Sequence, residues 1–206
     1  MIRVIIADDH SIVRQGIARL LDDHADVTVV AEIDAADDVV PTVLRLGCDV
    51  LLLDLSFPNR SGISILAELR QAACPARVII LSMHPEDQLA LHLMKEGAAA
   101  YLNKQRTPAE VLSAVRQVAA GGRYITETLS TLAFTADSEQ PPHGRLTARE
   151  YQVFVLLIEG LSVSRVAGEL SLTGSTVSNH VAAIKRKLNA GSIAEIVRYA
   201  ARLGLL

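Results

Sequence analysis

Five polar side chains stand directly after short apolar runs, and their types suit the binding of a divalent cation and a phosphoryl group. They are Asp8, Asp9, Asp54, Ser82 and Lys104. Mg²⁺ favours a few carboxylates together with phosphate oxygens of a substrate. A hydroxyl can donate a hydrogen bond to a phosphoryl group, and an ammonium can neutralise its charge. Each residue alone could simply be a polar residue that ends a strand, so the prediction depends on their coincidence.

The apolar runs have the length of buried strands and alternate with segments of helical spacing. The runs are Val4–Ala7, Val27–Ala31, Val50–Leu53, Val78–Leu81 and Ala99–Leu102, and the helical segments are Ile12–Leu21, Val39–Leu46, Ile63–Leu69, Leu89–Met94 and Val111–Val118. This alternation predicts an α/β domain, a (βα)5 doubly wound parallel sheet with helices on both faces. Because the carboxyl ends of parallel strands meet at one edge, the five polar side chains should converge there.

Capping residues and breakers divide the chain into domains. Thr107 to Glu110 reads as a capping box with proline at the first helical position, and His84-Pro85 predicts another helix start. Gly121-Gly122 ends the last helix of a first domain, residues 1–122. A linker follows over residues 123–144. It begins with a short helix near 124–134, and its second half, 136–144, is polar and rich in Pro and Gly.

The remaining residues, 145–206, predict a small domain of four helices. A second capping box starts the first helix at Thr147, and the later helices cover 163–170, 175–188 and 193–203, with a turn at 171–174 before the third. In the third helix an apolar stripe must face the core. It consists of Val177, Val181, Ile184 and Leu188. The second and third helices form a helix-turn-helix candidate, although a solvated amphipathic helix has the same pattern.

Charge separates the two predicted domains. Residues 143–206 carry a net charge of +4, and the other 142 residues carry −7. A basic back domain is a candidate for binding a polyanion. Cys48 and Cys74 lack metal-binding spacing, which favours reduced cysteines in a cytoplasmic protein. No run of about eighteen apolar residues predicts a membrane span, and the chain begins with a strand pattern where a signal peptide would stand.

The acidic residues and their flanking motifs resemble the receiver domain of bacterial two-component response regulators. The resemblance is carried by Asp8-Asp9-His10, Asp54 with Pro58 and Gly62, Ser82, and Tyr101-Leu102-Asn103-Lys104. It implies a flavodoxin-like fold of strand order 2-1-3-4-5, in which Asp54 accepts a phosphoryl group from a sensor histidine kinase.

The same resemblance implies roles for the residues around Asp54. Asp8, Asp9 and Asp54 would hold Mg²⁺ with the backbone carbonyl of Ser56. Ser82 and Tyr101 match the family's switch pair, although Tyr101 could also be an ordinary aromatic of an edge strand. His10 has no evident role, and a solvated loop residue is the simpler interpretation.

The back domain resembles the LuxR-type helix-turn-helix of NarL/FixJ response regulators. The matching residues are Leu146-Thr147, Arg149-Glu150, Glu159-Gly160-Leu161-Ser162, Ser175-Thr176-Val177, His180, Ile184 and Lys187-Leu188. The resemblance implies contacts to double-stranded promoter DNA and a homodimer after phosphorylation. The candidate DNA-binding residues are Arg165, Ser175, Thr176, Ser178, Asn179, Ala182, Lys185, Arg186 and Lys187.

Three departures from the LuxR-type pattern weaken the implied DNA contacts. Val163-Ser164-Arg165 replaces a polar run, Ser178 stands where a basic residue is common, and the stretch after Leu188 lacks the usual Arg/Thr pattern. They predict modest affinity or a strong dependence on dimerisation. Besides a phosphorylation-controlled transcription regulator, two alternatives stay open: a receiver with a degenerate helix-turn-helix that acts through protein contacts, and an enzyme that hydrolyses phosphate esters at the acidic site.

Overall fold

The structure is a computed structural model, and it describes residues 1–58, 60–83, 88–135, 142–170, 172–203 and 205. The chain divides into two compact units, residues 1–130 and 131–206, which are described separately below. This division falls inside the predicted linker 123–144, and the predicted domain limits stay predictions. The helix start expected at His84-Pro85, the linker residues 136–141 and Ser171 of the expected turn lie outside the described residues.

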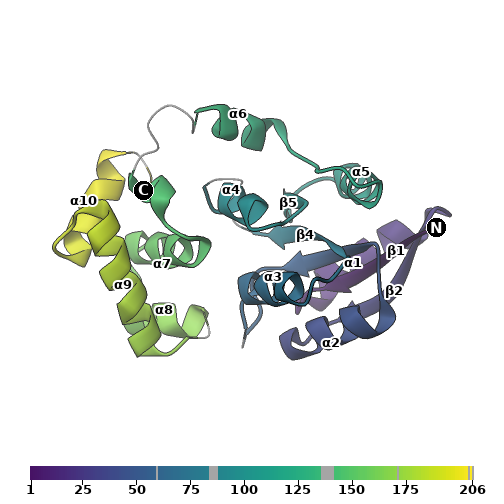
Figure 1. Ribbon diagram of the computed structural model, residues 1–206, viewed down its shortest axis with the longest axis horizontal. Helices are drawn as coiled ribbons and strands as arrows, with labels where there is room; N and C mark the ends of the chain where they lie inside the picture. Colours follow the sequence, from purple (N-terminus) through teal and green to yellow (C-terminus); the bar gives the residue numbers. More distant parts are fainter. Residues whose placement is uncertain (59, 84–87, 136–141, 171, 204, 206) are drawn as a thin grey trace. The chain divides into compact units, whose positions relative to one another are not determined.

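The first unit is built on a five-stranded parallel sheet of order β2-β1-β3-β4-β5 (Figure 1). Its strands are β1 (Ile2–Ala7), β2 (Val27–Ile33), β3 (Val50–Asp54), β4 (Arg77–Ser82) and β5 (Ala100–Asn103). All five strands and their implied order are confirmed, with ends that differ from the predicted ones by one or two residues. The central strand β3 is buried at every position, as its unbroken apolar run predicts for a parallel strand covered on both faces.

Helices connect successive strands and cover both faces of the sheet. They are α1 (Ser11–Asp22), α2 (Ala36–Leu46), α3 (Gly62–Gln71), α4 (Gln88–Lys95) and α5 (Pro108–Ala119). Helices α1 and α5 share one core with alternate strand residues such as Ile6 and Leu52. Because side chains alternate along a strand, Ile5 and Leu51 point to the opposite face, where α2, α3 and α4 pack. The (βα)5 prediction is therefore confirmed.

Helix α2 starts earlier than its apolar pattern predicts. This helix begins at Ala36, three residues before the predicted start, because its first turn contains the exposed Asp37 and Asp38. Acidic side chains stabilise the positive end of a helix without contributing to its apolar pattern. Periodicity alone therefore misses that turn.

Along the chain, α5 is followed by α6 (Glu127–Thr135), which overlaps the short helix predicted near 124–134. Residues 142–144 differ from the expected extended linker, because they form most of a short 3₁₀ helix, η1 (Pro142–Arg145). His143 is buried, its Nδ1 lies 2.8 Å from the Tyr199 hydroxyl, and its ring stacks on Phe154. The residues before the second capping box thus belong to the core of the second unit.

Among the described residues of the second unit, α-helices stand at each of the four predicted places. They are α7 (Ala148–Ile158), α8 (Val163–Glu169), α9 (Gly174–Leu188) and α10 (Ile193–Arg202). The predicted stripe of α9 is buried as expected, and α9 packs against α7, α8 and α10. Thr147 and Glu150 form the predicted capping box at the start of α7, and Asn189 ends α9 in the left-handed conformation. Among the described residues, no helix has the length and apolarity that crossing a membrane requires.

Candidate functional site

The carboxyl ends of the parallel strands bring three charged residues of the first unit close together. Asp8 follows β1 and Asp54 ends β3, and these two strands are neighbours in the sheet. Lys104 follows β5, and its backbone N–H donates to the Ser82 carbonyl at 2.8 Å. The sheet thereby brings groups separated by about half the chain to one edge, where open α/β sheets place their ligand sites.

Lys104 holds the two innermost carboxylates together. Its Nζ lies 2.8 Å from Oδ2 of Asp8 and 2.8 Å from Oδ2 of Asp54, and the three side chains are 4%, 0% and 1% exposed. Burial raises the pKa of Asp54 above its usual value, although the Lys104 ammonium and the Ser56 backbone N–H oppose this effect. The negatively charged form of Asp54 thus depends on the ammonium beside it.

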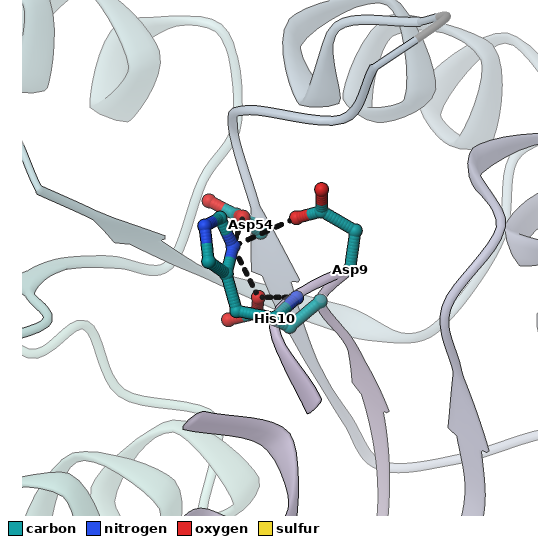
Figure 2. A group of neighbouring side chains, drawn as sticks. Asp9, His10 and Asp54 are labelled. Carbon is teal, nitrogen blue, oxygen red and sulfur yellow. Dashed lines mark hydrogen bonds and ion pairs between the residues drawn. The ribbon is translucent and has the colours of Figure 1, made fainter. Parts of the chain in front are cut away.

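His10 enters the same cluster, which the sequence analysis missed. Its Nδ1 lies 2.8 Å from Asp9 Oδ1, 3.3 Å from Asp8 Oδ1 and 3.8 Å from Asp54 Oδ2. Figure 2 shows the imidazole of His10 beside the carboxylates of Asp9 and Asp54. Its position directly after two acidic residues was the available signal. The backbone N–H of His10 also donates to Asp8 Oδ1 at 2.9 Å, which ties the residue to the site.

The arrangement of carboxylate oxygens fits a divalent cation. Within the part of the chain that the structure describes, Asp8, Asp9, His10 and Asp54 bring one ligand atom each to within 4.8 Å of one another. The nearest cationic or N–H groups to these oxygens are the Lys104 ammonium, 2.8 Å from Asp8 and from Asp54, and the His10 ring, 2.8 Å from Asp9. A single ammonium beside three carboxylates leaves negative charge, which a divalent cation would offset. The donor set therefore suits the predicted Mg²⁺.

The other predicted residues of the front site lie on the same edge. Ser56 donates its backbone N–H to Asp54 Oδ1 at 3.2 Å, so the loop after β3 is tied to the Asp54 carboxylate. Ser82 ends β4 and is fully buried. Tyr101 lies on the edge strand β5, paired with Ile80 of β4, and its ring is fully buried.

In the second unit, α9 presents a mostly exposed polar face. Ser175, Ser178, Asn179, Ala182 and Arg186 are exposed, Thr176 and Lys185 are half-buried, and Arg165 is exposed on α8. The side chain of Thr173 caps α9 and contacts the hydroxyls of Ser175 and Thr176 at 2.8 Å each. Small polar groups near the start and basic groups near the end give the distribution expected of a groove-reading helix.

Lys187 differs from the other candidate DNA contacts. Its Nζ lies 2.6 Å from Glu150 Oε2 and donates to the Arg145 carbonyl at 3.1 Å. The ammonium is therefore engaged inside the unit, where it joins the end of α9 to the start of α7. Periodicity could not distinguish Lys187 from Lys185, because the partner glutamate lies 37 residues away.

Glu150 should make the stability of the second unit sensitive to acid. Burial raises its pKa, but hydrogen bonds from Lys187 and Thr147 outweigh burial and leave the pKa below its usual value. A depressed pKa contributes stability above the unfolded pKa of about 4.3, and this contribution is lost as the pH falls through the folded value. Glu150→Gln should lower the free energy of unfolding by about 1–3 kcal/mol at pH 7. The difference in stability between wild type and variant should become smaller as the pH falls.

Hydrogen exchange of α7 and α9 peptides between neutral and mildly acidic pH checks this expectation. Glu169→Gln is the matched control, because Glu169 is exposed at the end of α8. A constant gap between wild type and Glu150→Gln at every pH would contradict the assigned role of the ion pair.

Comparisons with known protein families identify both units. Residues 4–116 match the response regulator receiver domain, and residues 144–200 match the bacterial regulatory proteins of the luxR family. The first match covers more than half of the chain and spans the whole acidic site.

Two similar proteins match this chain along nearly its whole length. The response regulator UvrY of Escherichia coli (strain K12) is 32% identical, over 100% of this chain and 96% of that protein. The transcriptional regulatory protein UhpA of the same strain is 35% identical, over 96% of this chain and 97% of that protein.

Among solved structures, RcsB from Salmonella enterica serovar Typhimurium, bound to promoter P1flhDC, has a TM-score of 0.72. It is 25% identical and covers 96% of this chain and 97% of that chain. One chain therefore carries a receiver domain followed by a luxR-family domain, and this combination identifies the family. The chain belongs to the NarL/FixJ family of two-component response regulators, which join a receiver domain to a LuxR-type helix-turn-helix that binds DNA and regulates transcription.

Proposed function

We propose that Asp54 is the phosphoacceptor of this response regulator and receives its phosphoryl group from a phosphohistidine of a sensor kinase. The observation that supports this role best is the buried carboxylate of Asp54 held 2.8 Å from the Lys104 ammonium. As a nucleophile, the carboxylate attacks phosphorus, the phosphorus–nitrogen bond of the donor breaks, and an acyl phosphate forms. Lys104 then neutralises charge on the transferred group, while Ser82 donates a hydrogen bond to it.

Asp8, Asp9 and Asp54, with the Ser56 carbonyl, are the proposed holders of Mg²⁺. When bound, the ion supplies positive charge that offsets the phosphoryl oxygens. Without such charge, the acidic neighbours of Asp54 repel an incoming anion. This assignment is supported by the convergence of the three aspartates, whose ligand oxygens lie within 4.8 Å of one another beside a single ammonium.

Ser82 and Tyr101 are the proposed switch pair that reports the new charge. Their strands β4 and β5 are neighbours, and β4 also pairs with β3, where Asp54 lies opposite Leu81, so a group bound to Asp54 is near the end of β4. A hydroxyl drawn to the phosphoryl group leaves space that the Tyr101 ring fills. Such a pair has two arrangements, and added charge at Asp54 biases the equilibrium between them.

In the second unit, α9 is the proposed reader of the major groove of promoter DNA. The small and polar side chains Ser175, Thr176, Ser178, Asn179 and Ala182 face the bases, and Arg165, Lys185 and Arg186 face phosphates. Lys187 is omitted because its ammonium is paired with Glu150. The solved RcsB complex, which holds promoter DNA in the presence of a phosphomimetic, supports the assignment by similarity.

Phosphorylation is proposed to convert the chain to a homodimer that binds DNA more tightly. Light scattering with and without beryllofluoride, a phosphoryl mimic, tests this on the full chain. The mass should double, and gel shifts with genomic fragments should appear at lower protein concentration. An unchanged mass together with unchanged DNA affinity would rule out this control mechanism.

The two other functions predicted from sequence have separate tests. A degenerate helix-turn-helix that acts through protein contacts is favoured if beryllofluoride changes the mass while no genomic fragment shifts. Hydrolysis of phosphate esters requires multiple turnover on a small ester.

The salt dependence of DNA binding should separate Lys185 from Lys187. Each phosphate contact contributes about 0.9 to the slope of log affinity against log salt. Lys185→Met should flatten the slope by about that amount, whereas Lys187→Met should leave it unchanged and instead destabilise the second unit. Fluorescence anisotropy across a series of salt concentrations measures the slope. Equal flattening by both variants would place Lys187 on DNA and contradict its internal role.

A further inference from the structure

Arg14 lies near the start of α1, and its guanidinium contacts the strand end that carries Asp8. The side chain is only 13% exposed, although charged side chains are mostly exposed to water. Its Nη1 donates to the backbone carbonyl of Asp8 at 2.6 Å. The backbone N–H of Arg14 donates to the His10 carbonyl at 3.0 Å. Arg14 therefore holds both ends of the short loop that joins β1 to α1.

The same guanidinium also faces the end of β2. Its Nε lies 3.5 Å from Glu32 Oε2, and its Nη2 lies 4.0 Å from Asp34 Oδ2. Strand β2 holds Asp8 as well, because the Asp8 N–H donates to the Ile33 carbonyl at 3.0 Å. Both backbone groups of Asp8 are thus fixed against β2, the N–H directly and the carbonyl through Arg14.

The carbonyl that Arg14 binds belongs to the peptide group between Asp8 and Asp9. Asp8 is fully buried, and its Oδ2 lies 2.8 Å from the Lys104 ammonium. A buried carbonyl that loses its donor costs free energy, so this peptide group would rotate toward another donor if the guanidinium were removed. Such a rotation would move the carboxylates on both sides of it.

The hydrogen bond of Arg14 and its charge should act on a bound cation in opposite directions. A positive charge near a cation site repels the ion, so the loss of the charge alone would strengthen cation binding. The loss of the hydrogen bond would misplace two carboxylates and weaken cation binding. The sign of the change in affinity therefore distinguishes a positional role from an electrostatic one.

We propose that Arg14 is a positioning residue of the phosphorylation site, which holds the peptide group between Asp8 and Asp9 and so orients both carboxylates. The inference rests on the function proposed above, in which Asp54 accepts the phosphoryl group and the neighbouring aspartates bind Mg²⁺. The donors of a guanidinium diverge in a rigid, planar fork, so one side chain can bind the carbonyl and face β2 at the same time. A lysine here would have the charge without the fork.

Phosphorylation of the full chain by phosphoramidate over a series of MgCl₂ concentrations tests the proposal. Arg14→Met removes the donors and keeps an unbranched side chain. It should raise the Mg²⁺ concentration at half-maximal rate by about tenfold, as expected for the loss of an outer contact of a metal ligand. The rate at saturating Mg²⁺ should stay close to that of the wild type, because Asp54 and Lys104 keep their contact.

Arg19→Met is the matched control, because Arg19 is exposed on the same helix, and it should leave the Mg²⁺ requirement unchanged. Titration calorimetry with MgCl₂, in the absence of a phosphoryl donor, should show the same loss of affinity in Arg14→Met. Urea unfolding shows whether this variant folds. If it does not fold, Arg14→Lys takes its place, and the Mg²⁺ requirement of that variant should also rise.

An Mg²⁺ affinity of Arg14→Met equal to or higher than that of the wild type would overturn the proposal. A lower rate at saturating Mg²⁺ with an unchanged Mg²⁺ requirement would overturn it too, because general damage to the fold has that effect. If Arg14→Lys must be used, an unchanged requirement in that variant has the same meaning. Failure of the proposed function gives a different result, in which the wild type itself takes up no phosphoryl group or takes it up without Mg²⁺.

Discussion

Asp54→Asn is expected to abolish acyl-phosphate formation while leaving the fold intact. The amide is a poor nucleophile and cannot form an acyl phosphate, but it has nearly the same shape and keeps an oxygen that can accept from the Ser56 N–H. After incubation with phosphoramidate and Mg²⁺, intact-mass spectrometry should detect one phosphoryl group on the wild type and none on the variant. DNA affinity and mass of the variant should also be indifferent to the donor.

Asp49→Asn is the matched control for this loss. Asp49 is an exposed aspartate just before the amino end of the same strand, and its removal should leave phosphoryl transfer unchanged. Phosphorylation of Asp54→Asn at the wild-type level would place the acceptor on another residue and defeat the proposed function.

The same variant has an expected pH signature without metal. Burial raises the pKa of Asp54, so its charged form costs stability at neutral pH, and this cost disappears as the pH falls through the folded pKa. In EDTA, Asp54→Asn should therefore unfold at a higher urea concentration than the wild type at pH 7. The difference should shrink on acidification, because the wild-type carboxyl group is then neutral as well.

Gly62→Ala should be the most damaging change of a residue that touches no ligand. A Cβ at this position would lie 2.2 Å from the Asp54 carbonyl oxygen and 2.9 Å from the Leu55 Cα, which are both backbone atoms. The first turn of α3 would have to move away from the loop that carries Asp54, where Gly62 N–H donates to the Leu55 carbonyl. We expect a loss of about 3 kcal/mol in the free energy of unfolding, together with slower phosphoryl transfer.

Gly16→Ala provides a control of opposite sign. Gly16 is exposed within α1 and no atom lies within 4 Å of an added Cβ, so alanine should stabilise the helix by about 0.5–1 kcal/mol. Urea unfolding measures both variants, and the rate of acyl-phosphate formation shows whether the site is distorted. If Gly62→Ala were as stable and as reactive as wild type, the tight approach of α3 to Asp54 would be wrong.

Much of the fold follows from sequence because its elements are locally encoded. The apolar runs, the capping boxes at Thr107 and Thr147 and the stripe of α9 each lie within a short window. The convergence of Asp8, Asp54 and Lys104 also follows, once the strands are known to be parallel. These predictions needed no knowledge of long-range contacts beyond strand direction.

The contacts that sequence reasoning missed all depend on distant partners or on side-chain direction. His143 was assigned to the linker because its neighbours are Pro and Gly, but Tyr199, 56 residues later, holds it in the core. Lys187 was placed among the candidate DNA contacts, although its ammonium forms an ion pair with Glu150. His10 was predicted to be a solvated loop residue, and its side chain is 60% exposed, but the contacts of its ring with three carboxylates were not predicted.

The hydrogen bond from the Lys104 N–H to the Ser82 carbonyl connects the backbone after β5 to the end of β4. In the proposed mechanism Lys104 responds to charge at Asp54 through its ammonium, and Ser82 belongs to the proposed switch. A displacement of Lys104 can therefore be transmitted to the end of β4 through this backbone hydrogen bond, without an intervening side chain. Signal strength in this receiver should accordingly depend on how stiffly the ends of β4 and β5 move together, a property that variants far from the acidic edge can tune.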